Sequence, residues 1–167
     1  MEAGGVEALT VSAVAQGAGV KAPSLYKHFV DRAALLKAVE ITILLELEAE
    51  LRRETRGKTP KARLKSMAHA YRRFGKAAPN RYRVIYSGNA FTDPEIREAC
   101  LFSAQPLFEE LRAAGIAEDR VLLVSRTMVP FLHGFVLMEI GSAFTVGGDV
   151  DEAFELGIAT ILAGVPG

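Results

Sequence analysis

The chain has 167 residues, of which 50% are hydrophobic and 24% charged, so it should fold as a soluble protein around a substantial core. Its single cysteine, Cys100, cannot form an intramolecular disulfide, which argues against a small disulfide-bonded secreted scaffold and favours the cytoplasm. The net charge is zero, but residues 1–87 carry 16 Lys and Arg against 8 Asp and Glu, and residues 88–167 carry 4 against 12. The basic first part indicates either contact with a polyanion or a solvated charge asymmetry without function.

Helical periodicity runs through nearly the whole chain and strand-like alternation is absent, so we expect an all-α fold. Residues 1–10 have neither the basic start nor the apolar core of a signal peptide, so none is expected. Two short helices should come first, over residues 10–17 and 22–29, around a turn at residues 18–20. Thr10 is the expected N-cap of the first helix, because its hydroxyl can accept a backbone N–H bond.

A longer helix is expected from its N-cap, Asp31. Its apolar residues recur at intervals of three or four and form one stripe: Leu36, Val39, Ile43, Leu47 and Leu51. Gly57 and Pro60 then interrupt the helical pattern inside a basic run. We therefore predict a head with its connecting helix at residues 1–56 and a helical body at residues 57–167.

In the body, a first helix should stop before Pro79, and a short helical piece should follow at residues 82–86. Asp93 and Pro94 are a start signal, an N-cap followed by proline at the first helical position. The helix that they begin is expected to run to Ala114.

The last two helices are expected at residues 119–143, with a kink at Pro130, and at residues 149–163. Asp149 starts the last helix as the N-cap of an Asp-led capping box. Residues 121–140 are apolar and long enough to cross a bilayer, but the stretch contains Arg126, His133 and Glu139. Each such ionised group costs about 2.5–3.5 kcal/mol at a bilayer centre, so we expect a buried helix and no membrane partner.

The most informative segment is residues 9–39, in which small and apolar residues occupy the positions that a helix-turn-helix needs. Ala15 lets the two short helices cross closely, and Gly19 permits a left-handed turn residue. Val20 and Leu25 fill the space between the helices, and Phe29 also falls at an apolar position of the motif. Two short helices that cross at a steep angle can present the second to a DNA major groove.

This segment closely resembles the head of the tetracycline-repressor (TetR) family of transcriptional regulators. The family pattern L-T-x-x-x-[LIV]-A-x-x-x-G-V-x-x-x-x-L-Y-x-H-F-x-x-[KR]-x-x-L is met at Leu9, Thr10, Val14, Ala15, Gly19, Val20, Leu25, Tyr26, His28, Phe29, Arg32 and Leu35. The match covers about thirty residues with many fixed spacings, which makes it specific. The resemblance implies a ligand-responsive regulator, a repressor that binds double-stranded operator DNA.

By position, the resemblance assigns DNA contact to nine residues of the head: Thr10, Ser12, Lys21, Ala22, Ser24, Tyr26, Lys27, His28 and Arg32. Thr10, Tyr26 and Arg32 match residues that contact phosphates. Lysine and hydroxyl groups bind phosphate oxygens, and Lys21 or Lys27 could instead donate to guanine. His28 has two open interpretations, a donor to phosphate or a buried ring that orients the helix.

The sequence departs from the family at its start. Family members have a helix of about fifteen residues before the glycine-rich turn that reads here Ala3-Gly4-Gly5-Val6. Without that helix, the apolar residues of the head should be partly unshielded, and several kcal/mol of packing could be lost. We expect either a misplaced start codon or an N-terminal deletion, and weak or absent DNA binding if the chain is the whole product.

The aromatic residues of the body are mostly expected to be core, but some could line an effector pocket between helices. The candidates for contact with a small apolar effector are Met67, Tyr71, Phe74, Tyr86, Phe102, Met128, Phe131 and His133. The tyrosine hydroxyls and His133 would be its polar handles. No cofactor is expected.

Residues 129–144 resemble a C-terminal subfamily with a tryptophan-histidine-glycine element, although Leu132 stands in place of the tryptophan. Gly134 of this element could let another helix approach closely. In the family the last two long helices form a four-helix homodimer interface. The apolar residues that exceed the needs of one core support this: Leu122, Leu123, Val136, Leu137, Ile140, Leu156, Ile158, Ile161 and Leu162.

An enzyme is the rival class, but three histidines, one cysteine and no metal-spaced cluster leave little for catalysis or metal binding. Ser66 and His69 are better read as neighbours on a helix surface than as a catalytic pair. The second alternative is a dimeric helical protein that binds small molecules but not DNA, because the first helix is absent.

Overall fold

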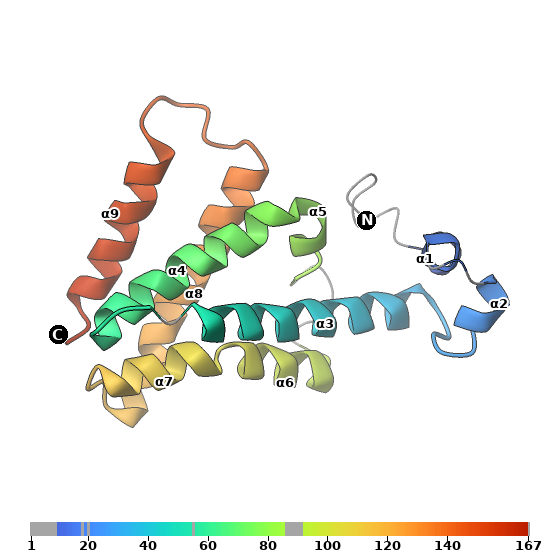
Figure 1. Cartoon of the computed structure of the whole chain (residues 1–167), viewed down its shortest axis with the longest axis horizontal. Coiled ribbons are helices and arrows are strands. Elements are labelled where there is room, and N and C mark those ends of the chain that lie inside the picture. Colours follow the sequence, from blue (N-terminus) through green and yellow to red (C-terminus); the bar gives the residue numbers. More distant parts are fainter. Residues whose placement is uncertain (1–9, 18, 20, 55, 86–91, 167) are drawn as a thin grey trace. The chain divides into compact units, whose positions relative to one another are not determined.

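The computed structural model describes residues 10–17, 19, 21–54, 56–85 and 92–166. In this part of the chain every regular element is a helix, which confirms the all-α prediction (Figure 1). The helices are α1 (Val11–Gly17), α2 (Ala22–Leu25), α3 (Arg32–Arg53), α4 (Pro60–Ala77), α5 (Pro79–Tyr82), α6 (Pro94–Ser103), α7 (Gln105–Ala113), α8 (Glu118–Ile140) and α9 (Val150–Ala163). Val20 and Tyr86 of the sequence predictions lie outside the described residues.

The head begins as its sequence predicts. Thr10 Oγ1 accepts a hydrogen bond from Ala13 N at 3.1 Å and thereby caps α1. Gly19 has a φ of +69°, the left-handed conformation that glycine adopts without steric cost. The predicted helix over residues 22–29 is wrong in length, because α2 ends at Leu25 and continues only as a turn.

A small core holds the head together around Leu35 of α3. Leu35 is buried, and partly buried apolar side chains pack against it: Val14, Leu25, Phe29, Leu36 and Val39. Asp31 Oδ1 accepts a hydrogen bond from Ala34 N at 2.8 Å, which confirms Asp31 as the N-cap of α3. Farther along α3, Ile43, Leu47 and Leu51 are buried as the predicted stripe requires.

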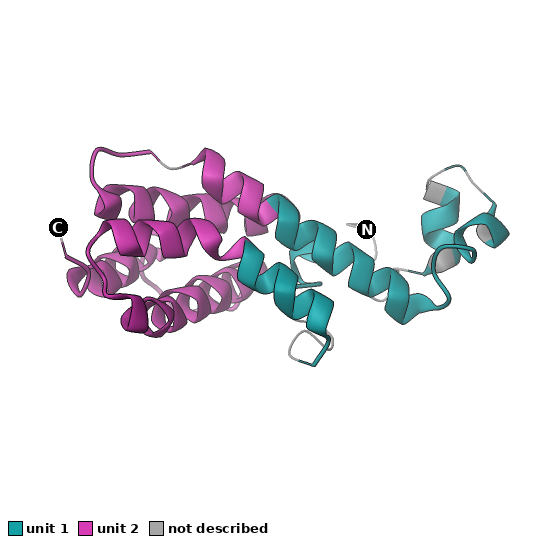
Figure 2. Ribbon diagram, turned by 90° about the horizontal axis from the view of Figure 1, so that it is seen from below, with its two compact units in different colours: residues 1–46, 78–102 teal, residues 47–77, 103–167 magenta. Residues whose placement is uncertain are grey.

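The chain divides into two compact units (Figure 2). Unit 1 comprises residues 1–46 and 78–102, and unit 2 comprises residues 47–77 and 103–167. These two units differ from the head and the body that the sequence predicts. The predicted boundary after residue 56 stays a prediction.

In unit 2, α4 packs against α7, α8 and α9, and α8 packs against both α7 and α9. The buried side chains come from one stripe of each helix, including Leu64 and Met67 of α4, Leu111 of α7 and Ile158 of α9. Burial of this apolar surface is the main stabilising term for such a bundle.

Two predicted helices of the body differ from the structure in their bounds. The helix expected from Asp93 to Ala114 is wrong as one element, because α6 ends at Ser103 and α7 begins at Gln105. Pro106 has no N–H to donate to the preceding turn, and it sits instead in the first turn of α7. The short piece expected at residues 82–86 is α5, which starts earlier because Pro79 fits a first helical position.

The start signals at Asp93 and Asp149 are confirmed. Asp93 Oδ1 accepts hydrogen bonds from Glu95 N and Ile96 N, at 2.9 and 3.2 Å. Asp149 Oδ1 accepts from the N–H groups of the two residues after Val150, at 2.7 and 3.1 Å. Each carboxylate therefore satisfies two otherwise unpaired helix donors.

Helix α8 is buried on one side only. Its buried residues, Val121, Ser125, Met128, Leu132 and Val136, recur every three or four positions. Among the described helices, α8 alone is long and apolar enough to span a membrane. A stretch of 18 residues within it has a mean hydropathy of 1.7, and 28% of that stretch is buried. The expectation of a buried helix is therefore correct for one face and wrong for the other, which exposes several apolar side chains, among them Leu122, Leu123 and Leu137.

Candidate functional site

The head exposes the polar side chains that the sequence assigns to DNA. Ser12, Lys21, Ser24 and Lys27 are exposed, and Tyr26 is 53% exposed. Ala22 begins α2, the helix expected to enter a groove. Lysine ammonium and hydroxyl groups on one short helix and its flanking turns are the donors that phosphate oxygens and base edges accept. The head therefore exposes groups that can donate hydrogen bonds to phosphates or base edges of DNA.

Three further head residues lie at the ends of elements. Thr10, which caps α1, and Arg32, the first residue of α3, are exposed, and the cap bond of Thr10 fixes the position of its hydroxyl. His28 is exposed, so of the two interpretations left open by the sequence, the buried orienting ring is wrong. An exposed imidazole can donate a hydrogen bond to an anion.

The candidate effector residues of unit 2 centre on one polar contact between α4 and α8. Tyr71 Oη lies 3.4 Å from His133 Nδ1, and Tyr71 is buried whereas His133 is half-buried. Burial lowers the pKa of His133, which favours the neutral ring at physiological pH. Met67 and Met128 are buried on the same two helices.

The remaining effector candidates lie in other settings. Phe74 is half-buried on α4, and Tyr86 lies outside the described residues. Phe102 is 46% exposed and lines a surface groove in unit 1, so it does not join the candidates of unit 2 as a core residue. The assignment of Phe102 to the effector pocket stays a prediction.

Phe131 belongs to an aromatic cluster between α8 and α9. Its ring stacks on Phe154 with centroids 6.0 Å apart, and Phe135 lies edge-on to Phe154 at 5.1 Å. A Cβ placed on Gly157 of α9 would lie 2.2 Å from Phe131 Cζ, far inside van der Waals contact. Gly157 therefore permits a close approach of α8 and α9. The sequence predicts such an approach at Gly134 instead, but a Cβ added to Gly134 would meet no described atom within 4 Å.

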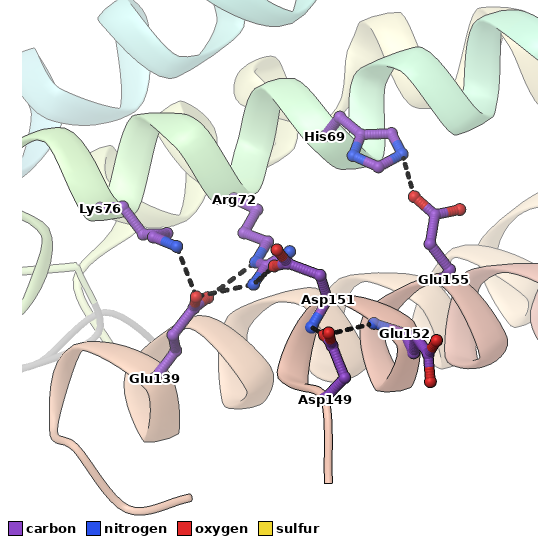
Figure 3. A network of polar contacts seen from close by, with 8 residues as sticks. All are labelled: His69, Arg72, Lys76, Glu139, Asp149, Asp151, Glu152 and Glu155. Atoms are coloured by element: carbon purple, nitrogen blue, oxygen red, sulfur yellow. Dashed lines mark hydrogen bonds and ion pairs between the residues drawn. The ribbon is translucent and has the colours of Figure 1, made fainter.

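A polar network next to this cluster links α4 to α8 and α9 (Figure 3). Arg72 donates from Nε and Nη2 to Glu139, each at 2.7 Å, and from Nη2 to Asp151 Oδ1 at 2.6 Å. Lys76 Nζ donates to Glu139 at 2.5 Å. Hydrogen bonds from Arg72 hold the pKa of the Glu139 carboxyl below its ordinary value.

The same network extends along α4 to His69. His69 Nε2 lies 2.9 Å from Glu155 Oε1, and Lys65 Nζ lies 2.8 Å from Glu155 Oε2. Ser66 donates instead to the Glu54 carbonyl at 2.6 Å, which agrees with the expectation that Ser66 and His69 are not a catalytic pair. Sequence reasoning missed the network, although a signal existed. Arg72 falls on the stripe of Leu64 and Ala68, and a charge on a buried stripe indicates an ion pair.

The predicted dimer residues separate into two sets. Leu122, Leu123, Leu137 and Leu156 are exposed, and Ile140 and Ile161 are half-buried. For Val136, Ile158 and Leu162 the prediction is wrong, because these side chains fill the core of the protomer. Met138 is exposed beside Leu137 and was not predicted. In the described part of the chain, no group of three His, Cys, Asp or Glu side chains could hold a metal ion.

Comparison with known proteins finds a family match for two segments of the chain. The family described as bacterial regulatory proteins, tetR family, matches residues 1–39, and the tetracyclin repressor-like C-terminal domain matches residues 64–161. An uncharacterized HTH-type transcriptional regulator of Mycobacterium tuberculosis is 31% identical over 140 residues, 81% of this chain and 63% of that protein. The chain therefore spans less than two thirds of that relative's length.

Two solved structures extend the similarity to the fold. A protein of unknown function from Rhodococcus sp. RHA1 has a TM-score of 0.81 and 25% identity, and the match covers 99% of this chain and 89% of that one. A TetR variant from Acinetobacter baumannii AYE, in complex with minocycline, has a TM-score of 0.71 and 25% identity. That match covers 98% of this chain and 88% of the other.

Proposed function

Because this chain belongs to the TetR family of bacterial transcriptional regulators, we propose that it is a cytoplasmic, ligand-responsive repressor that binds operator DNA as a homodimer. The observation that carries the proposal is the exposed polar surface of the head, in a chain whose two halves both match the family. Members of this family are regulators, so catalysis is not proposed.

The residues proposed to contact DNA are Thr10, Ser12, Lys21, Ala22, Ser24, Tyr26, Lys27, His28 and Arg32. Lys21 and Lys27 flank α2, so both ammonium groups could reach a phosphate or a guanine when this helix enters a major groove. A two-fold dimer would place two such helices about one DNA turn apart, roughly 34–36 Å.

The proposed dimer surface is the exposed apolar side of α8 and α9, which includes Leu122, Leu123, Leu137 and Leu156. Exposed apolar patches of this kind are rarely left uncovered on a soluble monomer. The same interface would account for the exposed leucines of α8, a helix that is long and apolar enough to span a membrane.

The proposed effector is a small, mainly apolar molecule bound near Tyr71 and His133. Met67 and Met128 supply apolar contact there, and the neutral imidazole and the phenol can each exchange a hydrogen bond with one polar group of the ligand. The minocycline complex of the Acinetobacter TetR variant shows that a relative with this fold binds a small molecule.

We further propose that effector binding shifts α3 and changes the separation of the two heads, so that both can no longer engage adjacent grooves. The coupling between the two sites would amount to about 1–3 kcal/mol, typical of such linkage. Within the family, we propose that the body belongs to the tryptophan-histidine-glycine subfamily, with Leu132, His133 and Gly134 on α8 in place of that element.

The experiment that tests this function selects DNA from a random duplex library and then titrates salt against the selected sequence. Specific binding by a regulator should be saturable and fall steeply with salt, because each phosphate contact releases a counterion. Binding of any sequence with equal affinity, or none, would refute operator recognition and favour the alternative, a dimeric helical small-molecule carrier without DNA binding.

A further inference from the structure

The first turn of α9 and the last turn of α8 are both bound to one side chain of α4, that of Arg72 (Figure 3). Arg72 Nη2 donates to Asp151 Oδ1 at 2.6 Å, and Arg72 Nε and Nη2 each donate to Glu139 at 2.7 Å. Glu139 is the second-last residue of α8, and Asp151 is the second residue of α9. The end of one helix and the start of the next are therefore held by the same guanidinium.

Two aromatic rings hold this guanidinium in place. The Cζ atom of Arg72 lies 5.5 Å from the ring centroid of Phe135 on α8 and 4.7 Å from that of Phe154 on α9. The two rings contact each other edge-on, with centroids 5.1 Å apart. Because the guanidinium is planar and its donors have fixed directions, this packing also fixes where the carboxylate of Asp151 can bind.

The chain that connects the two helices does little to fix the start of α9. Residues 141–149 are all exposed, and three of them are glycines, Gly141, Gly147 and Gly148. An exposed loop with several glycines constrains the helix that follows it only weakly. The first turn of α9 therefore depends on the bond between Asp151 and Arg72 for its position against α4.

Asp151 can set the tilt of α9 without belonging to the proposed dimer surface. Beyond the first turn, the buried side chains of Phe154 and Ile158 attach α9 to the core of unit 2. Loss of the bond at Asp151 would therefore let the helix tilt about these contacts. Leu156 of the dimer surface follows Asp151 by five positions, about 140° around the helix, so the two lie on different sides.

We propose that the ion pair between Arg72 and Asp151 is a positioning contact that sets the tilt of α9 against α8 and thereby the affinity of the homodimer. The inference rests on the homodimer proposed above, whose surface includes both helices. With the pair formed, Leu123 of α8 and Leu156 of α9 are presented to the partner in a fixed arrangement. Without it, association must also order the start of α9, which costs conformational entropy.

The pair is open to solvent from one side. The Asp151 side chain is 80% exposed, whereas that of Arg72 is 9% exposed. A hollow of about 420 Å³ lies along the same face of α4, lined by His69, Arg72, Arg73, Lys76 and Ala77. Ions can therefore reach the guanidinium and screen the pair. Salt does not weaken the association of apolar surfaces, so a dimer affinity that falls with salt would report this pair.

The test compares two acidic residues of the same turn, only one of which is bound to Arg72. Asp151 and Glu152 both donate their backbone N–H to Asp149, and Glu152 is exposed with no ion pair to any described residue. Asp151→Asn should raise the dimer dissociation constant about three- to tenfold, because each dimer contains two such pairs. Glu152→Gln removes the same charge from the same helix end and should change it less than about twofold.

Both variants are measured in the full chain by sedimentation velocity, at about 50 and about 500 mM NaCl. The higher salt should weaken the wild-type and Glu152→Gln dimers about two- to fivefold, and the Asp151→Asn dimer by less than half as much. Asp151→Glu keeps the carboxylate at an exposed position and should restore the wild-type affinity to within about twofold.

A double-mutant cycle separates positioning from a direct contact of Asp151 with the partner subunit. Arg72→Lys keeps a cation for Glu139, but an ammonium cannot reproduce the fixed fork of donors that serves both carboxylates. In this background Asp151→Asn should change the dimer dissociation constant less than about twofold. An equal loss of affinity in both backgrounds would show that Asp151 acts without Arg72 and would overturn the proposal.

The remaining outcomes are also distinct. Equal dimer affinities of Asp151→Asn and Glu152→Gln would overturn the positioning role and leave the proposed homodimer intact. A wild-type chain that is monomeric at all concentrations would overturn both. Weaker association of Asp151→Asn together with a loss of helical circular dichroism would show unfolding instead of a change in tilt, which overturns the proposal as well.

Discussion

Arg72 on α4 and Glu139 near the end of α8 form an ion pair with two hydrogen bonds, each 2.7 Å long. Both side chains are largely buried, with exposed fractions of 9% and 14%. The guanidinium also lies over the Phe154 ring of α9, 4.7 Å from its centroid. One side chain therefore connects three helices of unit 2, and its removal should be felt across the whole unit.

We predict that Glu139→Gln lowers the free energy of unfolding by about 2–4 kcal/mol, because it leaves a buried guanidinium with only part of its charge compensated. A double-mutant cycle with Arg72→Met, read by urea denaturation, should show a coupling energy of about 1–3 kcal/mol. Arg126→Met is the control, at an exposed position of α8, the helix that carries Glu139. It should change the free energy of unfolding by less than about 0.5 kcal/mol. Additive effects of the first two substitutions would contradict this account.

The second prediction concerns pH and His133. Burial lowers the pKa of His133 in the folded chain below its ordinary value of 6.5, so the unfolded chain binds the proton more readily. The stability that this contributes is present above pH about 6.5 and is lost as the pH falls through and below that value. His133→Gln should reduce the difference between the unfolding free energies at pH 7.5 and pH 5.5. An unchanged difference in His133→Gln would refute the prediction.

Two glycines, one on α8 and one on α9, provide a third prediction, with opposite signs. Gly157→Ala gains about 1 kcal/mol of helix propensity, but its Cβ would lie 2.2 Å from Phe131 Cζ, and overpacking typically costs about 1–3 kcal/mol. We expect net destabilisation of up to about 2 kcal/mol by thermal unfolding. Gly134→Ala meets no described atom within 4 Å and should be stabilising by about 0.5–1 kcal/mol. Stabilisation by both substitutions would show that the Phe131 ring moves freely.

Local signals predicted the helix starts well, because Thr10, Asp31, Asp93 and Asp149 act through bonds to their own following residues. The interruption at Ala104 was not predicted, since helical periodicity continues across it and only Pro106 signals the break. Periodicity also identifies an apolar residue without showing which neighbour covers it.

The sites show the same limit. Val136 and Leu137 are adjacent and similarly apolar, yet the first is fully buried and the second exposed. The pairing of Arg72 with Glu139 joins residues that are 67 positions apart, and no local pattern encodes a contact of that kind. The head was recognised from its motif because its residues lie close together in the sequence, whereas the pairs of unit 2 depend on tertiary packing.

The fourth prediction concerns DNA and Lys27. Lys27→Ala should weaken binding to the selected duplex and reduce the slope of log affinity against log salt by about 1, the contribution of one phosphate contact. Lys58→Ala removes an exposed lysine in the loop before α4 and should change neither quantity. The measurement is fluorescence anisotropy at several salt concentrations. If Lys27→Ala instead alters the preference for one base pair and leaves the slope unchanged, Lys27 contacts a base and not a phosphate.

The last prediction concerns the dimer. Leu156 is 69% exposed on α9, and Leu123 is 57% exposed on α8, so both offer apolar surface to a partner without any repacking of the protomer. Leu156→Glu would place an unpaired charge in the proposed interface, and we expect it to raise the dimer dissociation constant at least tenfold, about 1.4 kcal/mol.

Val146→Glu is the matched control, because Val146 is 88% exposed in the loop between the two helices and its substitution should leave the dimer intact. Sedimentation velocity over a range of concentrations distinguishes the outcomes. A wild-type chain that stays monomeric, or a Leu156→Glu variant that dimerises as tightly as the control, would exclude this face as the interface. Operator binding should fall with dimerisation in Leu156→Glu and persist in Val146→Glu, because two linked heads bind adjacent half-sites far more tightly than one head alone.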